Sequence, residues 1–241
     1  DQFWLIGNKA FVFDVKPSRI DRVKFEISKV IDNLKGDRLG IVVFSGSNFL
    51  YLPLTMDYDA AKLFVKSIDT NIISSKGTAI AQALETSVSS FSEEDQQEKM
   101  VFLFSDGEDH SNDSLNMIES NLPDDVRIHV IGVGSTKGSL IPVITEKENI
   151  FLKDSSGNLV MTKLNEEFLI KISEIGKGSF LRVSNNESIS DPIINIVSTG
   201  EKSLINSYEF SDYDYKYQYT LFFAILFLFV SYILPTGNRR V

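Results

Sequence analysis

The sequence predicts an α/β fold: a doubly wound, mostly parallel central sheet with helices on both faces. Two observations support this prediction. Short apolar segments alternate with segments of helical periodicity along most of the chain. In addition, residues 101–104 form an unbroken apolar run that leads directly into the acidic loop Ser105-Asp106-Gly107. Such a run is typical of a strand that is buried on both faces of a parallel sheet.

Composition limits both the size and the class of the protein. The chain has 241 residues, which suits one ordinary domain with an appendage. A net charge of -9 argues against nucleic-acid binding, because such binding requires a basic surface. The chain contains no cysteine, which excludes disulfides, zinc thiolate sites and cysteine nucleophiles.

In the first half of the chain, apolar runs and helix caps predict five elements. They are a strand over 10–13 that ends at Asp14, a helix from Pro17 to Leu34, strands over 39–44 and 49–54, and a helix over 60–68 capped by Asp57 or Asp59. Pro17 suits the first turn of the helix, and Gly36 lies just beyond its end. Ile20, Val23 and Ile27 mark the buried face of this helix by their spacing.

The second half continues the alternation. The first predicted elements are a helix over 79–91, a charged loop over 92–98, the strand over 101–104, a helix over 113–121 and a strand over 127–133. They are followed by a hairpin over 151–162, a helix over 165–175 that Asn165 caps, a strand over 180–183 and a helix over 189–198. The hairpin is predicted from the turn-forming residues 154–157.

Residues 219–234 predict a transmembrane helix. They contain no charged residue, although a span usually needs about 20 residues. Tyrosines lie at both ends, and Arg239 and Arg240 follow, as is usual at a membrane interface on the cytoplasmic side. The alternative is a buried C-terminal core helix. The predicted organisation is a lead-in over 1–8, a domain over 9–204, a juxtamembrane linker over 205–218, the transmembrane helix over 219–234 and a basic cytoplasmic tail over 235–241.

Several catalytic and nucleotide-binding motifs are poorly matched. Residues 132–139 are rich in glycine but lack the order of a phosphate-binding loop, so a turn after a strand is the better interpretation. His110 and His129 are the two histidines, and His129 lies within an apolar strand, where we expect it to be a packed residue. A serine-histidine-aspartate triad is therefore poorly supported.

Asp14, Thr78 and Asp106 are the candidate metal ligands. Each lies near the end of a strand or in a loop that precedes a helix. Carboxylate and hydroxyl oxygens are hard ligands that suit Mg²⁺, Mn²⁺ or Ca²⁺. In an open α/β sheet, ligands bind beyond the carboxyl ends of the strands, where Asp106 is expected.

Taken together, several local motifs resemble the von Willebrand factor A domain, and within it the Bat-type (aerotolerance-associated) bacterial membrane proteins. The resemblance spans about residues 11–198. The motifs are Lys16-Pro17-Ser18-Arg19, residues 36–44, Leu52-Pro53-Leu54-Thr55, Gly77-Thr78-Ala79-Ile80, residues 105–110, Ile131-Gly132-Val133-Gly134 and residues 154–164.

The resemblance implies a metal-ion-dependent adhesion site. Its pattern is Asp-x-Ser-x-Ser after the first strand, a Thr and a further Asp; Thr78 and Asp106 match the last two. Asp14 would be the first Asp, but the loop after it is shorter than the pattern, and Lys16 stands at the first serine position. One alternative is that the loop is deleted and the site is incomplete, with Asp14 matching a later Asp of the pattern. The other is that the segment is missing from this sequence.

The sequence thus predicts a protein-binding module and not an enzyme. The resemblance implies an adhesion or scaffold module in the bacterial inner membrane, with its domain facing the periplasm or exterior and partners that are membrane or envelope proteins. It also implies a role in envelope stress tolerance or in assembling a membrane complex. One alternative is a metal-independent scaffold. A remote one is a metal-assisted hydrolase that uses Asp106, Glu108 and His110.

Overall fold

The computed structural model of the chain describes most of its first 209 residues. The described ranges are 1–7, 14–15, 17–69, 72, 77, 79–92, 98–108, 113–144, 149–154, 156–183 and 188–209. Contacts divide the chain into two units, Asp1–Glu201 and Lys202–Val241. Of the second unit the structure describes residues 202–209, which are helical. The features below belong to the first unit, and helix α6, Ser190–Glu209, packs there with its residues 190–201.

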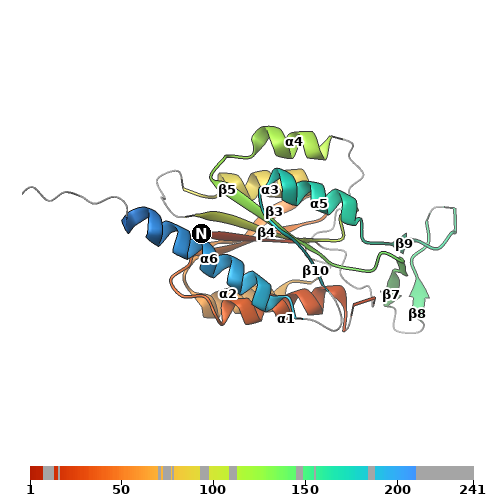
Figure 1. The fold of residues 1–241 in the computed structure, drawn as a ribbon. Coiled ribbons are helices and arrows are strands. Elements are labelled where there is room, and N and C mark those ends of the chain that lie inside the picture. Colours follow the sequence, from red (N-terminus) through yellow and green to blue (C-terminus); the bar gives the residue numbers. More distant parts are fainter. Residues whose placement is uncertain are drawn as a thin grey trace, which may run out of the picture. The chain divides into compact units, whose positions relative to one another are not determined.

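A six-stranded sheet forms the centre of this unit (Figure 1). Its strands lie in the order β10-β5-β4-β1-β2-β3, and each neighbouring pair is parallel except β2 and β3. The bounds are β1 Gln2–Gly7, β2 Leu39–Phe44, β3 Asn48–Thr55, β4 Lys99–Ser105, β5 Val126–Gly132 and β10 Phe180–Arg182. The mostly parallel sheet that the sequence predicts is confirmed.

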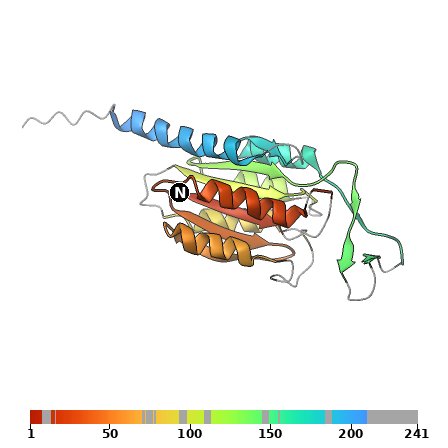
Figure 2. The ribbon, with the colours of Figure 1, turned by 90° about the horizontal axis from the view of Figure 1, so that it is seen from below.

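Helices cover both faces of the sheet, as predicted (Figures 1 and 2). The helices of one face are α1 Arg19–Ile31, α2 Tyr58–Ser67 and α6 Ser190–Glu209, and those of the other are α3 Ile80–Ser89, α4 Ser114–Asn121 and α5 Glu166–Ile175. Each group packs on its own cluster of buried apolar side chains, so the unit has two hydrophobic layers. The burial of these layers supplies most of the driving force for folding.

The central strand β1 contributes to both layers. Trp4 and Ile6 lie in the layer under α1, α2 and α6, whereas Phe3 and Leu5 lie in the layer under α3, α4 and α5. All four side chains are fully or almost fully buried. This alternation is the period of an extended strand, and burial on both faces explains why the run is continuously apolar.

The position of the first strand corrects the sequence prediction. The sequence predicts the first strand at residues 10–13 and a lead-in over residues 1–8. The predicted lead-in is wrong, because Gln2–Gly7 is the central strand of the sheet and pairs with both β2 and β4. Residues 10–13 lie outside the described part of the chain. Both runs are apolar, and periodicity cannot decide which of them pairs with the sheet.

Most of the other predicted boundaries agree with the structure to within a few residues. Ser18, Asp57 and Asn165 accept hydrogen bonds from the first turns of α1, α2 and α5. Helix α6 extends to Glu209, well beyond the predicted end at residue 198. The predicted transmembrane segment, residues 219–234, lies outside the described residues, and within those residues we find no helix with the length and hydrophobicity to span a bilayer.

A small β structure projects from the sheet after β5, and we call residues 139–163 the arm. Its strands are β6 Ser139–Leu140, β7 Pro142–Ile144, β8 Asn149–Phe151 and β9 Met161–Thr162. The predicted turn is present: Asp154 accepts hydrogen bonds from the amides of Ser156 and Asn158, and Lys153 pairs with Leu159. Beyond that bridge the pairing differs from a simple hairpin, because β8 pairs with β7 and β9 with β6.

A buried carboxylate joins α1 to the start of α6. The Glu26 side chain has no exposed surface, and its Oε2 accepts hydrogen bonds from Ser188 Oγ at 2.8 Å and from the amides of Ile189 and Ser190 at 3.2 and 3.0 Å. Arg22 Nη2 lies 2.8 Å from Glu26 Oε1. A negative charge at a helix N-terminus is favourable, because it complements the helix dipole and the unpaired amides there.

The substitution Glu26→Gln should therefore destabilise the domain. Hydrogen bonds to a charged group contribute more than those to a neutral one, so we expect a loss of about 2 kcal/mol in the free energy of unfolding. Urea denaturation measures this, with Glu119→Gln, an exposed position on α4, as the control that should change little. Equal effects of the two substitutions would contradict the role of Glu26.

Candidate functional site

The candidate site lies at the edge of the sheet where the parallel strands end. Asp106 directly follows β4, as the sequence predicts, and its side chain is buried. The turn after it is held locally: Asp106 Oδ1 accepts from the Glu108 amide at 3.2 Å, and the Asp106 carbonyl accepts from the Asn165 amide at 2.8 Å. The start of α5 is thus tied to the end of β4.

A guanidinium group lies between the two candidate aspartates. Arg19 donates from Nε to Asp14 Oδ1 at 2.8 Å and from Nη2 to Asp14 Oδ2 at 2.7 Å, and its Nη1 donates to Asp106 Oδ2 at 3.1 Å. The side chains of Arg19, Asp14 and Asp106 expose 3%, 6% and 5% of their surface. The pairing with Asp14 is bidentate, the strongest geometry for an arginine and a carboxylate.

Asp14 remains charged in this setting. Burial raises the pKa of its carboxyl, but the hydrogen bonds and charge of Arg19 and the amide of Ser135, which donates at 2.7 Å, outweigh burial and lower the pKa below its usual value. The deprotonated form is therefore favoured by direct contacts. Because Ser135 follows β5, Asp14 also joins the loop before α1 to the loop after β5.

Thr162 and Gly134 shape the place that the guanidinium occupies. Thr162 is fully buried in the arm; its hydroxyl accepts from Arg19 Nη1 at 3.3 Å and donates to Asp106 Oδ2 at 3.1 Å. Gly134 has φ +136°, and a Cβ there would lie 2.8 Å from Arg19 Cζ. A side chain at Gly134 would therefore collide with the guanidinium as well as strain the backbone.

The position of Arg19 is unfavourable for an isolated cation. Arg19 is the first residue of α1, and the N-terminus of a helix disfavours positive charge. Burial of an unpaired guanidinium would add a large desolvation cost. The two carboxylates offset both costs, so the three side chains form one mutually dependent group.

The described residues do not fit a divalent cation at this place. The predicted ligands Asp14 and Asp106 do come together, but the group between them is Arg19, and a metal ion could bind there only if that side chain moved out. Hard cations also need about six oxygen ligands, and the described residues contain no group of three or more His, Cys, Asp or Glu side chains that could hold a metal. Thr78 lies outside the described residues.

The position of β1 changes which residues follow the first strand of the sheet. Because β1 ends at Gly7, the next residues are Asn8-Lys9-Ala10-Phe11, and none of them is an Asp or a Ser. The serines of the implied Asp-x-Ser-x-Ser pattern are therefore not found directly after this strand. That Asp14 matches a later Asp of the pattern stays a prediction.

Sequence reasoning missed Arg19, Gly134 and Thr162 as site residues. Arg19 stands in the motif Lys16-Pro17-Ser18-Arg19, and Gly134 ends the motif Ile131-Gly132-Val133-Gly134. Both motifs carry the family resemblance, but neither indicates that these two residues meet. Thr162 lies in the irregular arm, twenty-three residues after Ser139, the first residue of the arm. No local pattern indicates that Thr162 reaches Asp106. The only sequence signal for this ion-pair group is Arg19 itself, which is close in sequence to Asp14 and far from Asp106.

The remaining sequence candidates do not join this site. His129 is a packed strand residue, as predicted: it stacks on Phe102 with 5.2 Å between ring centroids, and burial, followed by the charge of Arg127, lowers its pKa to about 4. His110 lies outside the described residues. Residues 133–138 form a turn after β5, and the Ser135 amide there binds Asp14.

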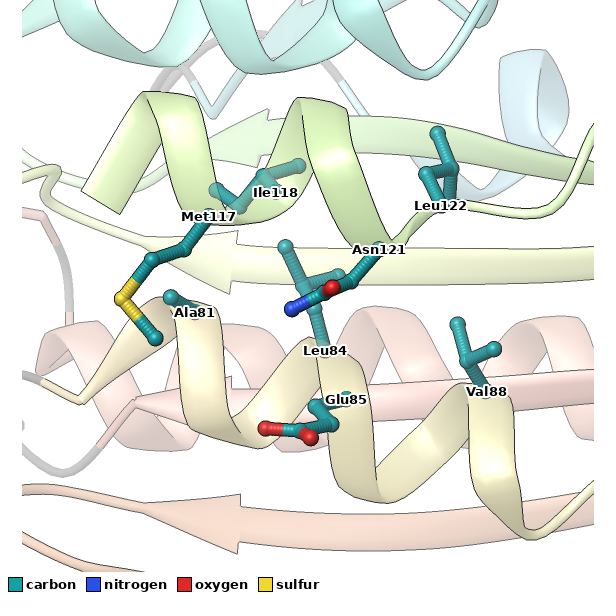
Figure 3. A pocket seen from close by; sticks show the side chains of 8 residues that line it. All are labelled: Ala81, Leu84, Glu85, Val88, Met117, Ile118, Asn121 and Leu122. Atoms are coloured by element: carbon teal, nitrogen blue, oxygen red, sulfur yellow. The ribbon is translucent and has the colours of Figure 1, made fainter. Parts of the chain in front are cut away.

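A shallow groove lies between α3 and α4 (Figure 3). Leu84, Val88, Met117 and Leu122 make it apolar, and Glu85 is the only ionisable group in its lining. Figure 3 shows no set of polar side chains that converges in the groove. The groove is therefore not equipped for acid-base chemistry, which requires positioned proton donors and acceptors.

The chain is similar in sequence and fold to known proteins of one family. The profile of the von Willebrand factor type A domain matches residues 7–108. The crystal structure of the conserved hypothetical protein BatB from Bacteroides thetaiotaomicron has a TM-score of 0.77 and 34% identity, over 83% of this chain and 97% of that one. An aerotolerance-related membrane protein from Bacteroides fragilis, solved with multiple mutations to serines, has a TM-score of 0.73 and 34% identity, over 80% and 96%.

A more distant match shares the fold alone. The manganese-loaded TRAP protein of Plasmodium vivax has a TM-score of 0.54 and 16% identity, over 79% of this chain and 70% of that one. No match was found among curated proteins.

Replacement of Arg19 tests the site. In Arg19→Met the two carboxylates lose their buried cation, and we expect the free energy of unfolding to fall by about 3–5 kcal/mol at neutral pH. Chemical denaturation measures the loss. Arg182→Met is the control, because Arg182 is exposed and its ion pair with Glu166 should contribute about 1 kcal/mol or less.

The cost of Arg19→Met should depend on pH. Asp14 has its pKa lowered from 3.8 in the folded protein, so its ion pair stabilises the wild type above that pH and the contribution is lost as the pH falls through the folded pKa. Without Arg19, burial raises the pKa, and protonation relieves the variant. The difference between the two proteins should therefore shrink on acidification to about pH 4; a constant difference would contradict the charge pairing.

Proposed function

We propose that this chain, which belongs to the von Willebrand factor A domain family and within it to the Bat-type proteins, is a membrane-anchored protein-binding module whose recognition does not require a divalent cation. The fold is one that serves protein interaction and adhesion in this family. The identity of 34% to BatB over almost all of that structure supports the placement.

The observation that carries the proposal is the Arg19 guanidinium between Asp14 and Asp106. In the adhesion mechanism implied by the family resemblance, an acidic side chain of the partner completes the coordination of a metal ion. Here a covalently attached cation is already bound by the two aspartates and by Thr162. Its hydrogen bonds are directed inward, so it cannot offer an open coordination position to a partner.

Membrane anchoring is proposed from the sequence of residues 219–234. The uncharged run, its flanking tyrosines and the following Arg239 and Arg240 favour a single helix that leaves the domain outside the cytoplasm. A relative is described as a membrane protein, which supports the same placement in the bacterial inner membrane. We propose that the domain faces the periplasm or exterior and binds other envelope proteins.

We propose that the module is not an enzyme. Of the three residues considered for a hydrolase, Asp106 is bound by Arg19 and Thr162, and the Glu108 carboxylate accepts the Lys163 amide at 2.6 Å. Both carboxylates are thus used in holding the structure. A general base needs a free oxygen within reach of the proton that it removes.

Metal titration tests the proposal. Millimolar Mg²⁺, Mn²⁺ or Ca²⁺, or a chelator, should leave the melting temperature of the wild type unchanged, and isothermal titration should show no site-specific binding. Arg19→Ala empties the place between Asp14 and Asp106 and is the matched variant: a cation that binds there should raise its melting temperature by mass action. Metal binding by the wild type that Asp106→Ala abolishes would overturn the proposal.

Membrane anchoring has a separate test in bacterial cells. The full chain should remain with the membrane fraction after high-salt and alkaline washing. The double substitution Leu226→Arg and Leu228→Arg should release it, because each arginine at the centre of a span costs about 2.5–3.5 kcal/mol. Release of the wild type by the same washing would refute the anchor and leave the metal question untouched.

A further inference from the structure

The groove between α3 and α4 is formed by one face of each helix, and we call it the α3–α4 groove. On α3 it is lined by Ala81, Leu84, Glu85 and Val88, whose spacing of three and four positions marks one side of a helix. Figure 3 shows Leu84 and Val88 pointing toward α4, and Met117 of α4 pointing toward α3. The open space between the two helices is about 280 Å³.

The floor of the groove is apolar and continuous with the core. Leu84 and Ile118 are buried in the layer that α3, α4 and α5 cover. Val88 and Leu122 pack on the same layer but remain partly exposed. Met117 forms one wall and exposes 38% of its surface. Because methionine is unbranched and flexible, this wall can adapt its shape to a bound side chain.

Backbone chemistry favours a helix as the occupant of the groove. Both walls are helices, whose backbone groups are hydrogen-bonded internally, so the groove offers no sheet edge to which an extended segment could add. A bound helix satisfies its own backbone and needs side-chain contacts alone. α3 has ten residues and α4 has eight, so the groove accommodates about two to three turns of a partner helix. Side chains four positions apart on that helix would pack between the two rows.

The walls of the groove carry an excess of negative charge. Neither α3 nor α4 contains a lysine or an arginine. With the described residues next to them they form the stretches 79–92 and 113–127, in which five residues are acidic and one, Arg127, is basic. Glu85 lines the groove itself and forms no ion pair with any described residue. An acid in this position favours a cationic group in the molecule that binds there.

Cations from neighbouring segments do not cancel this excess. Lys177 Nζ lies 2.6 Å from Asp124 Oδ1, and Lys99 Nζ lies 2.8 Å from Asp125 Oδ2. Both pairs neutralise the turn that follows α4, and not the length of the groove. With Arg127 included, five carboxylates stand against three cations, which leaves a charge of -2. Anionic lipid headgroups and the same face of a second copy would therefore be repelled.

From these observations we infer that the α3–α4 groove docks an amphipathic, basic helix of a partner protein. Apolar side chains one turn apart on that helix would cover Leu84 and Ile118, and a lysine or arginine beside them would pair with Glu85. The inference rests on the proposed function as a protein-binding module and names the class of partner.

Designed peptides test the inference on the full chain in nonionic detergent with chelator present. The probe is a labelled peptide of about 14 residues, or four turns, with leucines at helical spacing and lysines on its other face. One matched peptide carries glutamate for lysine, and another has the same composition with leucine and lysine alternating, as in a strand. After subtraction of binding to detergent micelles alone, fluorescence anisotropy should show the tightest binding for the helical lysine peptide.

Two kinds of substitution should change the affinity in different ways. Val88→Ser with Met117→Ser removes apolar contacts and should weaken binding of the helical lysine peptide by about tenfold. Glu85→Lys should weaken binding of this peptide by about two- to fivefold and strengthen that of the glutamate peptide by a similar factor. Such an exchange of preference cannot arise from misfolding, and unchanged melting temperatures confirm folding of each variant.

Matched controls lie in and just before α2, which covers the other face of the sheet. Met56→Ser with Leu63→Ser removes two apolar side chains that expose 58% and 68% of their surface, and Asp59→Lys reverses an exposed charge. Neither control should change the affinity for any of the peptides.

Disulfide cross-linking locates the bound peptide, because the chain contains no cysteine of its own. Asn121→Cys introduces a thiol in the lining of the groove, and Leu63→Cys introduces one on α2. A helical lysine peptide with one cysteine among its leucines should cross-link to the first variant and not to the second.

Several outcomes would overturn the inference. They are equal affinity of the wild type for the helical lysine and glutamate peptides, groove variants that bind as the wild type does, or equal cross-linking at positions 121 and 63. The same holds if no peptide binds while Glu85→Lys abolishes a dimer seen by sedimentation. Absence of peptide binding alone would refute the groove and leave metal independence to the metal titration. Peptide binding that requires Mg²⁺ would instead retain the groove and refute the metal-independent function.

Discussion

The ion-pair group of Arg19, Asp14 and Asp106 joins parts of the chain that are far apart in sequence. It connects the start of α1, the segment before it and the end of β4, and through Ser135 and Thr162 it reaches the loop after β5 and the arm. Each member is costly to bury alone, and each removes that cost for the others. The arrangement at this edge of the sheet therefore depends on all of them being present together.

Helix α1 is held at two points by buried charge. Arg19 in its first turn binds the carboxylates at the edge of the sheet, and Glu26, two turns later, caps the start of α6. Between these points Ile20, Val23 and Ile27 pack on the layer that includes Trp4 of β1. Apolar burial supplies the stability of this face, whereas the two charged residues determine the position of α1 relative to its neighbours.

A guanidinium differs from a metal ion in ways that matter for recognition. It is covalently attached, it donates hydrogen bonds in one plane, and it has no coordination position to exchange with a partner. The proposed module accordingly recognises its partner elsewhere. Thr162 of the arm completes the ion-pair group, because its hydroxyl contacts both Arg19 and Asp106.

The sequence by itself determined the fold class, most of the helices and strands, and the place of Asp106 at the end of a buried strand, because periodicity, caps and turn residues are local signals. It did not determine which of two apolar runs is the central strand, since Phe3 to Ile6 and residues 10–13 are equally apolar and only pairing with β2 and β4 distinguishes the former. It also indicated Asp14 and Asp106 as oxygen ligands without showing what lies between them. The tertiary structure decided that the Arg19 guanidinium lies between them. Arg19 is separated in sequence from Asp106 by 87 positions and from Thr162 by 143 positions, and no local pattern records contacts over such separations.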